Sequence, residues 1–249
     1  MTKIESKAIN FIKKNILLFL LGAVSIIAIV IRACGIDFQS DDFNSFLNSW
    51  WSIIKLNDFT GLATQVGNYN IPYQVIIYLM TLLPLNALYA YKIVSIIFDF
   101  VLAISTAMLV YSFAKNNRRL KAILTYSAVL LSATVIFNSS FWAQCDSIYT
   151  SFIILAILFL HKDKPIASFV FIGVAFAFKL QTVFIIPVLL YYWISTKKIS
   201  ILHFFIIPAV DVIMCLPAII MGRPFIDIIT IYAEQTDYGK LIQMNCPNF

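Results

Sequence analysis

Charged residues are scarce in this chain. They make up 12% of the 249 residues, whereas 61% are hydrophobic. Soluble globular domains carry about 25% charged residues and about 45–50% apolar ones. With a mean hydropathy of +0.89, most of the chain needs lipid around it rather than water. The composition therefore excludes an ordinary soluble domain and predicts a protein of the membrane lipid bilayer.

Clusters of metal-binding or nucleophilic residues are absent from the sequence. The four cysteines are widely spaced, form no C-x-x-C pair, and have no cluster of histidines beside them. A structural zinc site needs such spacing, so we expect the cysteines to act as small buried side chains. His161 and His203 lie far from the acidic residues described below, and no His-based nucleophilic triad is indicated.

Acidic residues are fewer than basic ones, 12 against 18. The basic residues form short clusters between apolar runs, a pattern typical of membrane topology signals, so we expect no nucleic-acid partner. The first cluster precedes the apolar run Ile16–Ile31, as in a signal peptide. No small-x-small cleavage site follows, and more apolar segments do, so we interpret this run as a retained first transmembrane helix.

Seven segments approach the length of about 20 mostly apolar residues that a membrane-spanning helix needs. They are Asn15–Gly35, Lys92–Ala114, Ala122–Asn138, Ser147–His161, Pro165–Lys179, Thr182–Ser195 and Ile199–Met221. An eighth apolar segment, Ile71–Ala90, is interrupted by Pro72, Pro84 and Asn86. The distribution of basic residues decides whether that eighth segment crosses the membrane.

If Ile71–Ala90 does not cross, 12 of the 18 basic residues fall on one side. They are Lys3, Lys7, Lys13, Lys14, Lys115, Arg118, Arg119, Lys121, Lys162, Lys164, Lys197 and Lys198. Basic residues are enriched in cytoplasmic loops. We therefore predict an all-α polytopic protein of a bacterial cell membrane, with seven transmembrane helices and a cytoplasmic N-terminus.

The predicted organisation is a single membrane domain, 1–249. It has a first transmembrane helix at 15–35, an outer loop at 36–91, six further transmembrane helices at 92–221, and the start of a second outer loop at 222–249. That second loop stops at Phe249 shortly after it begins. From this we expect the chain to be truncated at its C-terminus.

The outer loop at 36–91 carries two helical patterns. Between Phe43 and Lys55, apolar residues recur at helical spacing and include the paired Trp50 and Trp51. This pattern predicts a short amphipathic helix at the membrane interface, with the tryptophans at headgroup depth. The apolar Tyr73–Leu83 segment predicts a second interfacial or re-entrant helix. Irregular backbone at membrane depth is tolerated where it is buried in protein or lines a wet cavity, so the loop indicates a cavity.

The notable polar residues fall on the outer side of this topology. They are Asp37, Asp41, Asp42, Lys92 with Asp99 about two turns deeper, Trp142, Gln144, Asp146, Lys179, Gln181, Asn245 and Asn248. Charges at the bilayer centre are costly, so Asp99, Asp146 and Lys179 favour a shared polar cavity over lipid. Structural alternatives stay open: solvated loop acids, Asp146 as a helix N-cap, snorkelling of Lys179, and an internal pair of Lys92 with Asp99.

Five ordered motifs resemble one family. They are NYNIPY (Asn68–Tyr73), YKIVSIIFDF (Tyr91–Phe100), NSSFWAQCDSIYTSF (Asn138–Phe152), FKLQTVFIIP (Phe178–Pro187) and MNCPN (Met244–Asn248). On these motifs the chain resembles bacterial relatives of the second GPI-anchor mannosyltransferase, which belong to the GT-C class of integral-membrane glycosyltransferases. The resemblance implies a seven-helix N-terminal module whose first outer loop carries two interfacial helices and a catalytic acid. Two departures are Ala143, where many relatives have glycine, and the lack of the family's later helices.

The resemblance also implies roles for individual residues. The family's loop acid lies in a Ser-x-Asp-aromatic context, which maps onto Asp42, so Asp42 is the expected catalytic base and Asp41 the second candidate. A phosphate leaving group needs positive charge or hydrogen-bond donors, which Lys179 is expected to supply. The other expected substrate-binding residues are Tyr69, Lys92, Trp142, Gln144, Asp146, Gln181, Asn245 and Asn248. Whether Asp146 orients acceptor hydroxyls or holds a divalent cation stays open, and no other cofactor is indicated.

The function that the resemblance implies is glycosyl transfer. The expected reaction moves a hexose, such as mannose, with inversion from a polyprenyl-phosphate sugar donor to a cell-envelope glycan or lipid acceptor on the outer face. A transporter or lipid flippase is the alternative from a different class. It predicts inverted repeats with broken helices at matching positions, and the sequence has no such repeat. An inactive truncated remnant is the third alternative.

Overall fold

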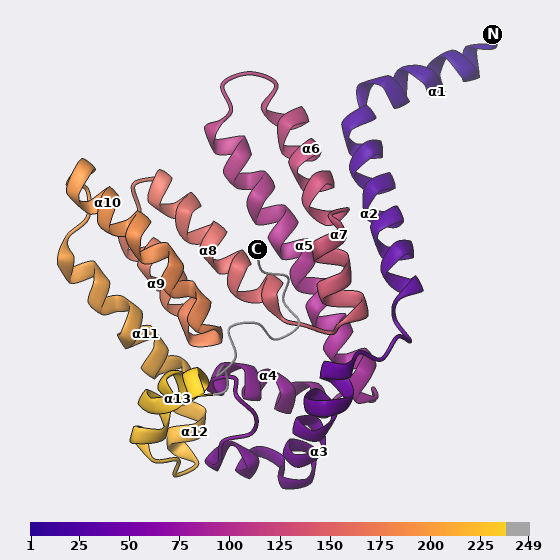
Figure 1. Cartoon of the computed structure of the whole chain (residues 1–249). Coiled ribbons are helices and arrows are strands. Elements are labelled where there is room, and N and C mark those ends of the chain that lie inside the picture. Colours follow the sequence, from indigo (N-terminus) through magenta and orange to yellow (C-terminus); the bar gives the residue numbers. More distant parts are fainter. Residues whose placement is uncertain (238–249) are drawn as a thin grey trace, which may run out of the picture.

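The computed structural model describes residues 1–237 of the chain and the side chains of residues 1–233. Within this part every regular element is a helix, and no strand occurs. The all-α prediction is therefore confirmed. Figure 1 shows the arrangement: long helices run side by side, and a layer of short helices lies across their lower ends.

The long helices follow one another through space in an order that differs from the order in the chain. Neighbouring pairs are α2 with α6, α6 with α5, α5 with α8, α8 with α9, and α9 with α11. Their bounds are α2 (Ile16–Cys34), α5 (Ala87–Phe113), α6 (Arg118–Leu130), α8 (Asp146–His161), α9 (Pro165–Phe178), α10 (Ile186–Thr196) and α11 (Ile206–Met214). The most extensive contacts include those between helices adjacent in sequence, α5 with α6 and α8 with α9, while α2 with α6, α5 with α8 and α9 with α11 join helices that are farther apart in the chain.

Two helices, α2 and α5, are long and apolar enough to cross a membrane, and a bent pair makes a third candidate. The bent pair joins α6 to the segment Ala133–Phe141, at an angle of 51°. This segment comprises α7 (Ala133–Ile136) and the π-helical turn η3 (Phe137–Phe141). The other apolar helices, which include α8 and α9, are shorter than 18 residues. Membrane association is thus supported, and seven crossings stay a prediction.

Prolines and tight turns explain why the later helices are short. The helices α9, α10 and α12 (Leu216–Ile220) each have proline at their first or second position, where its missing N–H costs nothing. The 3₁₀ turns η4 (Leu180–Ile185) and η5 (Ile201–Phe205) precede α10 and α11. A continuous helix at Ile199–Met221 was expected, but it is broken at Cys215, directly before Leu216 and Pro217.

Two helix starts also differ from the prediction. α5 begins five residues before Lys92, because the Asn86 side chain accepts a hydrogen bond from the Tyr89 backbone N–H at 2.9 Å and caps the helix there. The N-terminal lysine cluster forms its own helix, α1 (Lys3–Lys14), which the sequence did not predict. Its first turn is closed by a capping box between Thr2 and Glu5, and Figure 1 shows it projecting from the bundle.

The outer loop folds into the lower layer. It contains the π-helical turn η1 (Phe43–Leu47), α3 (Asn48–Asn57), the 3₁₀ turn η2 (Asp58–Ala63) and α4 (Ile71–Thr81). Both helical patterns predicted there are therefore present as helices. The tryptophans differ from expectation: Trp50 and Trp51 are buried in protein, next to the rings of Tyr69 and Tyr91. The apolar side of this helix packs on the layer's own core instead of facing lipid. The other helices of the layer are α12 and α13 (Phe225–Asp237) (Figure 1).

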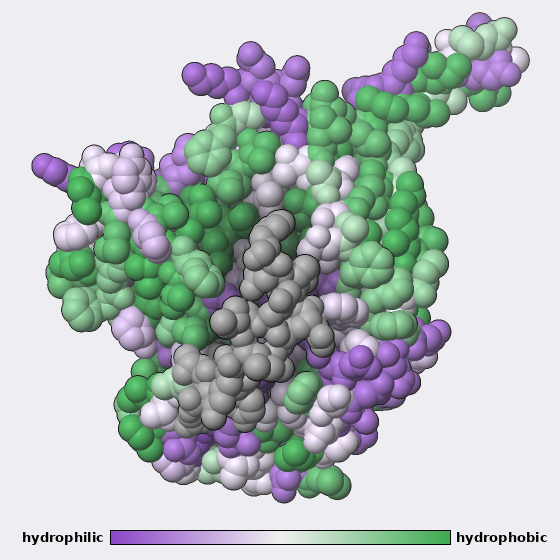
Figure 2. Space-filling view, in the orientation of Figure 1, coloured by the Kyte–Doolittle hydropathy of each residue, from purple (hydrophilic) through white to green (hydrophobic). Residues whose placement is uncertain are grey.

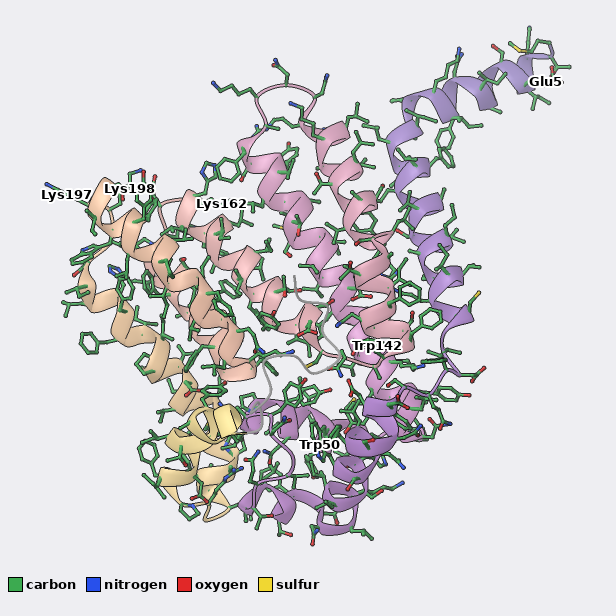
Figure 3. All side chains as sticks on the ribbon, in the orientation of Figure 1. Glu5, Trp50, Trp142, Lys162, Lys197 and Lys198 are labelled. Atoms are coloured by element: carbon green, nitrogen blue, oxygen red, sulfur yellow. The ribbon has the colours of Figure 1, made fainter. Side chains whose placement is uncertain are left out.

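The surface divides along the length of the bundle. In Figure 2 hydrophobic residues cover much of the left and right sides of the visible face at mid-height, while hydrophilic residues gather at the upper end and at the lower right. Figure 3 places Lys162, Lys197 and Lys198 at the upper end and Trp50 and Trp142 at the lower one. An apolar band between two polar ends is the arrangement expected of a protein that lies in a bilayer.

Candidate active site

The catalytic acid expected from the sequence lies at the start of the first helix of the lower layer. The hydroxyl of Ser40 accepts a hydrogen bond from the Phe43 backbone N–H at 3.1 Å, so Ser40 caps this helix. The same hydroxyl donates to the backbone carbonyl of Trp142 at 3.3 Å. Asp41 and Asp42 then occupy the first turn, where the helix dipole favours negative charge. The Ser-x-Asp-aromatic pattern is thus a helix start that is tied to the loop after η3.

Asp42 lies in a cleft together with two of the predicted site residues. The amide nitrogen of Gln144 donates to the Asp42 carboxylate at 2.7 Å, and the hydroxyl of Tyr69 donates to the amide oxygen of Gln144 at 3.2 Å. These three side chains line a cleft of about 170 Å³, which Phe46, Leu47, Trp50 and Asn68 complete. One wall of the cleft is therefore aromatic and the other carries a carboxylate and an amide.

The aromatic wall depends on a glycine. Gly67 has a φ of +72°, and a Cβ there would lie 2.3 Å from the indole of Trp50. Only glycine combines this backbone conformation with such close contact. Gly67 therefore fixes where Trp50 lies against Tyr69.

Tyr69 connects the cleft to a second group of charges. Burial, followed by the neighbouring Cys145 and Asp146, holds the pKa of Tyr69 well above its usual value. Its hydroxyl therefore stays protonated at neutral pH and donates to Gln144. The ammonium of Lys179 lies 5.6 Å from the centre of the Tyr69 ring and 5.6 Å from that of Tyr149, within the range of a cation–π interaction.

Lys179 forms an ion pair with Asp146. The pair is only partly exposed, with 17% of the Lys179 side chain and 36% of the Asp146 side chain accessible. The other carboxylate oxygen of Asp146 accepts from the amide of Asn138 at 2.8 Å. Asp146 is the first residue of α8 and its side chain does not cap the helix. The structural alternative of a capping Asp146 is therefore wrong, while snorkelling of Lys179 stays an open alternative.

Asn138 is a site residue that sequence reasoning missed. Its amide oxygen is buried without a hydrogen-bond partner in the described part of the chain. The available signal was its position as the first residue of the motif that also contains Gln144 and Asp146.

A buried charge network inside the helix bundle supports the segment between Asn138 and Asp146. The Asp99 carboxylate accepts hydrogen bonds from Arg32 at 2.9 Å, from Ser139 at 2.5 Å and from Ser147 at 2.5 Å. Arg32 and Asp99 are almost completely buried, at 1% and 0% exposure of their side chains. Because Ser139 and Ser147 follow Asn138 and Asp146 directly, this network fixes both ends of the segment that carries Gln144.

Lys92 was expected either to bind substrate or to pair with Asp99, but it binds backbone carbonyls instead. Its ammonium donates to three backbone carbonyls, those of Gly35, Ile36 and Phe38, at 2.7, 3.0 and 2.5 Å. The internal pair of Lys92 with Asp99 is therefore wrong, since each has other partners. All three protons of the ammonium are used, so Lys92 holds the turn between α2 and Ser40 in place.

The remaining predicted residues lie outside the cleft. Asp41 and Gln181 are exposed, and Trp142 is 54% exposed. Asn245 and Asn248 lie outside the described residues. Burial raises the pKa of the Cys145 thiol to about 11, so this residue is a neutral thiol at pH 7 and a weak nucleophile. Among the described residues, no three His, Cys, Asp or Glu side chains gather in a way that could hold a metal ion.

The backbone of Ala143 is strained, and a substitution tests this. It is fully buried and has a φ of +57°, a conformation that favours glycine. We expect Ala143→Val to lower the free energy of unfolding by about 2 kcal/mol or more, because a β-branched side chain is strongly disfavoured there and has no room. Chemical unfolding in detergent measures the change. Ala143→Gly is the control and should be tolerated. Equal stability of the Val variant and wild type would contradict the strain.

Comparisons with known proteins gave no match: no family model, no curated protein and no solved structure is similar to this chain. The function is therefore argued from the site itself.

Proposed function

We propose that this protein is an integral-membrane glycosyltransferase of the GT-C type, with seven transmembrane helices. It would move a hexose, with mannose as the first candidate, from a polyprenyl-phosphate donor to a cell-envelope glycan or lipid acceptor. The observation that carries the proposal is the hydrogen-bonded chain Asp42–Gln144–Tyr69, with the Lys179–Asp146 ion pair beside the Tyr69 ring. It brings a carboxylate and an ammonium to the same end of the bundle.

In the proposed orientation this end faces outward. The opposite end carries Lys162, Lys197 and Lys198 (Figure 3), and basic residues favour the cytoplasmic side. A lipid-linked donor would keep its polyprenyl chain in the bilayer and present its phosphate at the outer boundary. The cleft is lined by Trp50 of α3 and by Asn68 and Tyr69 just before α4, at the end of the bundle where such a phosphate would arrive.

The proposed reaction is a displacement at the anomeric carbon. The acceptor hydroxyl oxygen forms the new bond to that carbon, the bond to the phosphate oxygen breaks, and the polyprenyl phosphate leaves with the electron pair. The hydroxyl proton passes to the Asp42 carboxylate, which Gln144 holds by its amide. Attack opposite the leaving group inverts the anomeric configuration.

Lys179 suits the negative charge that develops on the leaving phosphate. Preorganised cations at such a position contribute strongly to catalysis, because they need not reorganise during the reaction. The Tyr69 and Tyr149 rings and Asp146 hold the ammonium in place. In this proposal Asp146 positions Lys179, and its second oxygen, which accepts a hydrogen bond from Asn138, orients an acceptor hydroxyl.

A transfer assay tests the function. Membranes that contain the protein would be given polyprenyl-phosphate sugars labelled in the sugar, and the products would be separated into donor, free sugar and glycosylated acceptor. We expect label to appear in acceptor from the lipid-linked donor, and not from the same sugar supplied as a nucleotide sugar. Movement of intact labelled donor between leaflets without transfer would contradict this proposal and support a flippase.

A further inference from the structure

A groove at the other end of the bundle has no part in the proposed reaction. It runs between α2, α5 and α6 and has a volume of about 600 Å³, which is within the range of about 300–1,000 Å³ typical of ligand pockets. Its walls include Leu21, Ile104, Met108 and Ile123, and its mouth carries Arg118 and Lys162. Figure 3 shows Lys162 at the upper, basic end of the bundle.

The polar groups inside the groove have their hydrogen bonds within the protein. The two hydroxyls at its floor, those of Ser25 and Tyr126, form a hydrogen bond with each other at 2.8 Å. The Ser112 hydroxyl donates to the Leu109 carbonyl at 2.6 Å. With their hydrogen bonds made inside the protein, these groups favour a hydrocarbon chain in the groove over a polar ligand.

The groove also opens to the lipid-facing surface. Ile104, Met108 and Tyr111 along α5 are 49%, 46% and 42% exposed. From Ile104 to Tyr111 the helix rises by about 10 Å, which gives an extended apolar strip that starts at the mouth. An acyl chain laid along this strip would cover all three side chains.

The mouth is positively charged and preformed. Arg118 donates from its Nε to the Tyr111 carbonyl at 3.0 Å, and its guanidinium lies 4.7 Å from the centre of the Tyr111 ring. This contact leaves the two terminal nitrogens of Arg118 without a hydrogen bond to any described residue. Lys162 makes no ion pair in the described part of the chain, and no acidic residue lines the groove. The mouth therefore offers donors and two uncompensated positive charges.

We propose that this groove binds one anionic glycerophospholipid of the cytoplasmic leaflet. Its phosphate would lie between Arg118 and Lys162, and one acyl chain would lie along α5 between α2 and α6. Basic pockets between transmembrane helices on the cytoplasmic side recognise anionic headgroups in this way. The proposal rests on the membrane orientation of the proposed function, but it is independent of the sugar chemistry.

Lipid binding to the purified protein tests the proposal. The protein in mild detergent would be titrated with phosphatidylglycerol or phosphatidylcholine of identical acyl chains, and bound lipid would be counted by native mass spectrometry. We expect one phosphatidylglycerol to bind at least about tenfold more tightly than phosphatidylcholine, because two charges face the headgroup. No sugar donor is present, so the result does not depend on glycosyl transfer.

Two variants separate the groove from general charge attraction. Arg118→Gln with Lys162→Gln should reduce phosphatidylglycerol affinity about tenfold or more. Arg119→Gln with Lys121→Gln is the matched control: it removes the same charge from exposed residues of the same region that do not line the groove, and should retain the affinity. An equal loss in both double variants, or equal binding of the two lipids, would overturn the proposal.

A third variant tests the acyl-chain path. Ala122→Phe places a ring in the groove while the basic mouth stays intact. We expect it to lower phosphatidylglycerol affinity without changing the unfolding midpoint in detergent by much. If Ala122→Phe binds the lipid as wild type does, the lipid does not occupy the groove and the proposal fails.

Discussion

Asp42→Asn is expected to reduce sugar transfer by about 10²–10⁴-fold, the usual contribution of a positioned general base. Asparagine has nearly the same shape as aspartate and still accepts the hydrogen bond that Gln144 donates. The cleft should therefore keep its geometry, while the group that receives the acceptor proton is lost. The measurement is the initial rate of transfer from labelled polyprenyl-phosphate donor, with the amount of protein in the membrane determined in parallel.

Two further variants isolate Asp42 from the other acids of the same loop. Asp58→Asn is the matched control, because Asp58 is exposed, lies outside the cleft, and asparagine has nearly the same shape as aspartate. It should transfer sugar as wild type does. Asp41→Asn tests the second candidate; because Asp41 is exposed beside the cleft, we expect a much smaller loss. Full activity of Asp42→Asn would refute the assignment of the base.

Asp99→Ala is expected to lower the free energy of unfolding by about 3–5 kcal/mol, because it leaves the buried Arg32 guanidinium without its carboxylate. The substitution also removes the acceptor for Ser139 and Ser147. Since these serines fix the segment that carries Gln144, transfer activity should fall as well. Chemical unfolding in detergent, followed by circular dichroism, measures the stability.

Two controls test whether the loss of stability in Asp99→Ala comes from the unpaired buried charge. Lys198→Ala breaks the pair between Asp163 and Lys198, whose side chains are 65% and 57% exposed. Exposed pairs contribute little, so this variant should unfold nearly as wild type does. Arg32→Met combined with Asp99→Leu removes both buried charges and should recover much of the stability that Asp99→Ala loses. If Asp99→Ala unfolds as wild type does, the buried network is not a structural support.

Local signals in the sequence located some of the helices closely. The predicted Ser147–His161 and Pro165–Lys179 segments differ by one residue each from α8 and α9. Proline at the start of α9 and charged residues between the apolar runs mark these ends, and both act through the residues next to them in the chain. The helix that follows Ser40 was predictable for the same reason, since its serine cap is a local contact.

The partners of the buried charges were not predictable in this way. Arg32 and Asp99 are 67 residues apart, and Lys92 bonds the chain 54–57 residues before it. Lys92 and Asp99 share one helix, so the sequence favoured a pair between them. Packing of α5 against α2 and the η3 segment instead turns Asp99 toward Arg32 and leaves Lys92 at the turn after α2.

The candidate site shows the same difference between what local sequence signals predict and what packing decides. The sequence by itself determined that the chain is helical and apolar, that its basic residues gather between apolar runs, and that Asp42, Gln144, Asp146 and Lys179 belong near one end. These properties follow from composition and spacing. Only the tertiary structure decided that Asp42 bonds Gln144, that Tyr69 lies between Gln144 and Lys179, and that Asn138 holds Asp146. The physical reason is that hydrogen bonds and ion pairs require contact within a few ångströms, which packing between distant helices sets and local patterns do not.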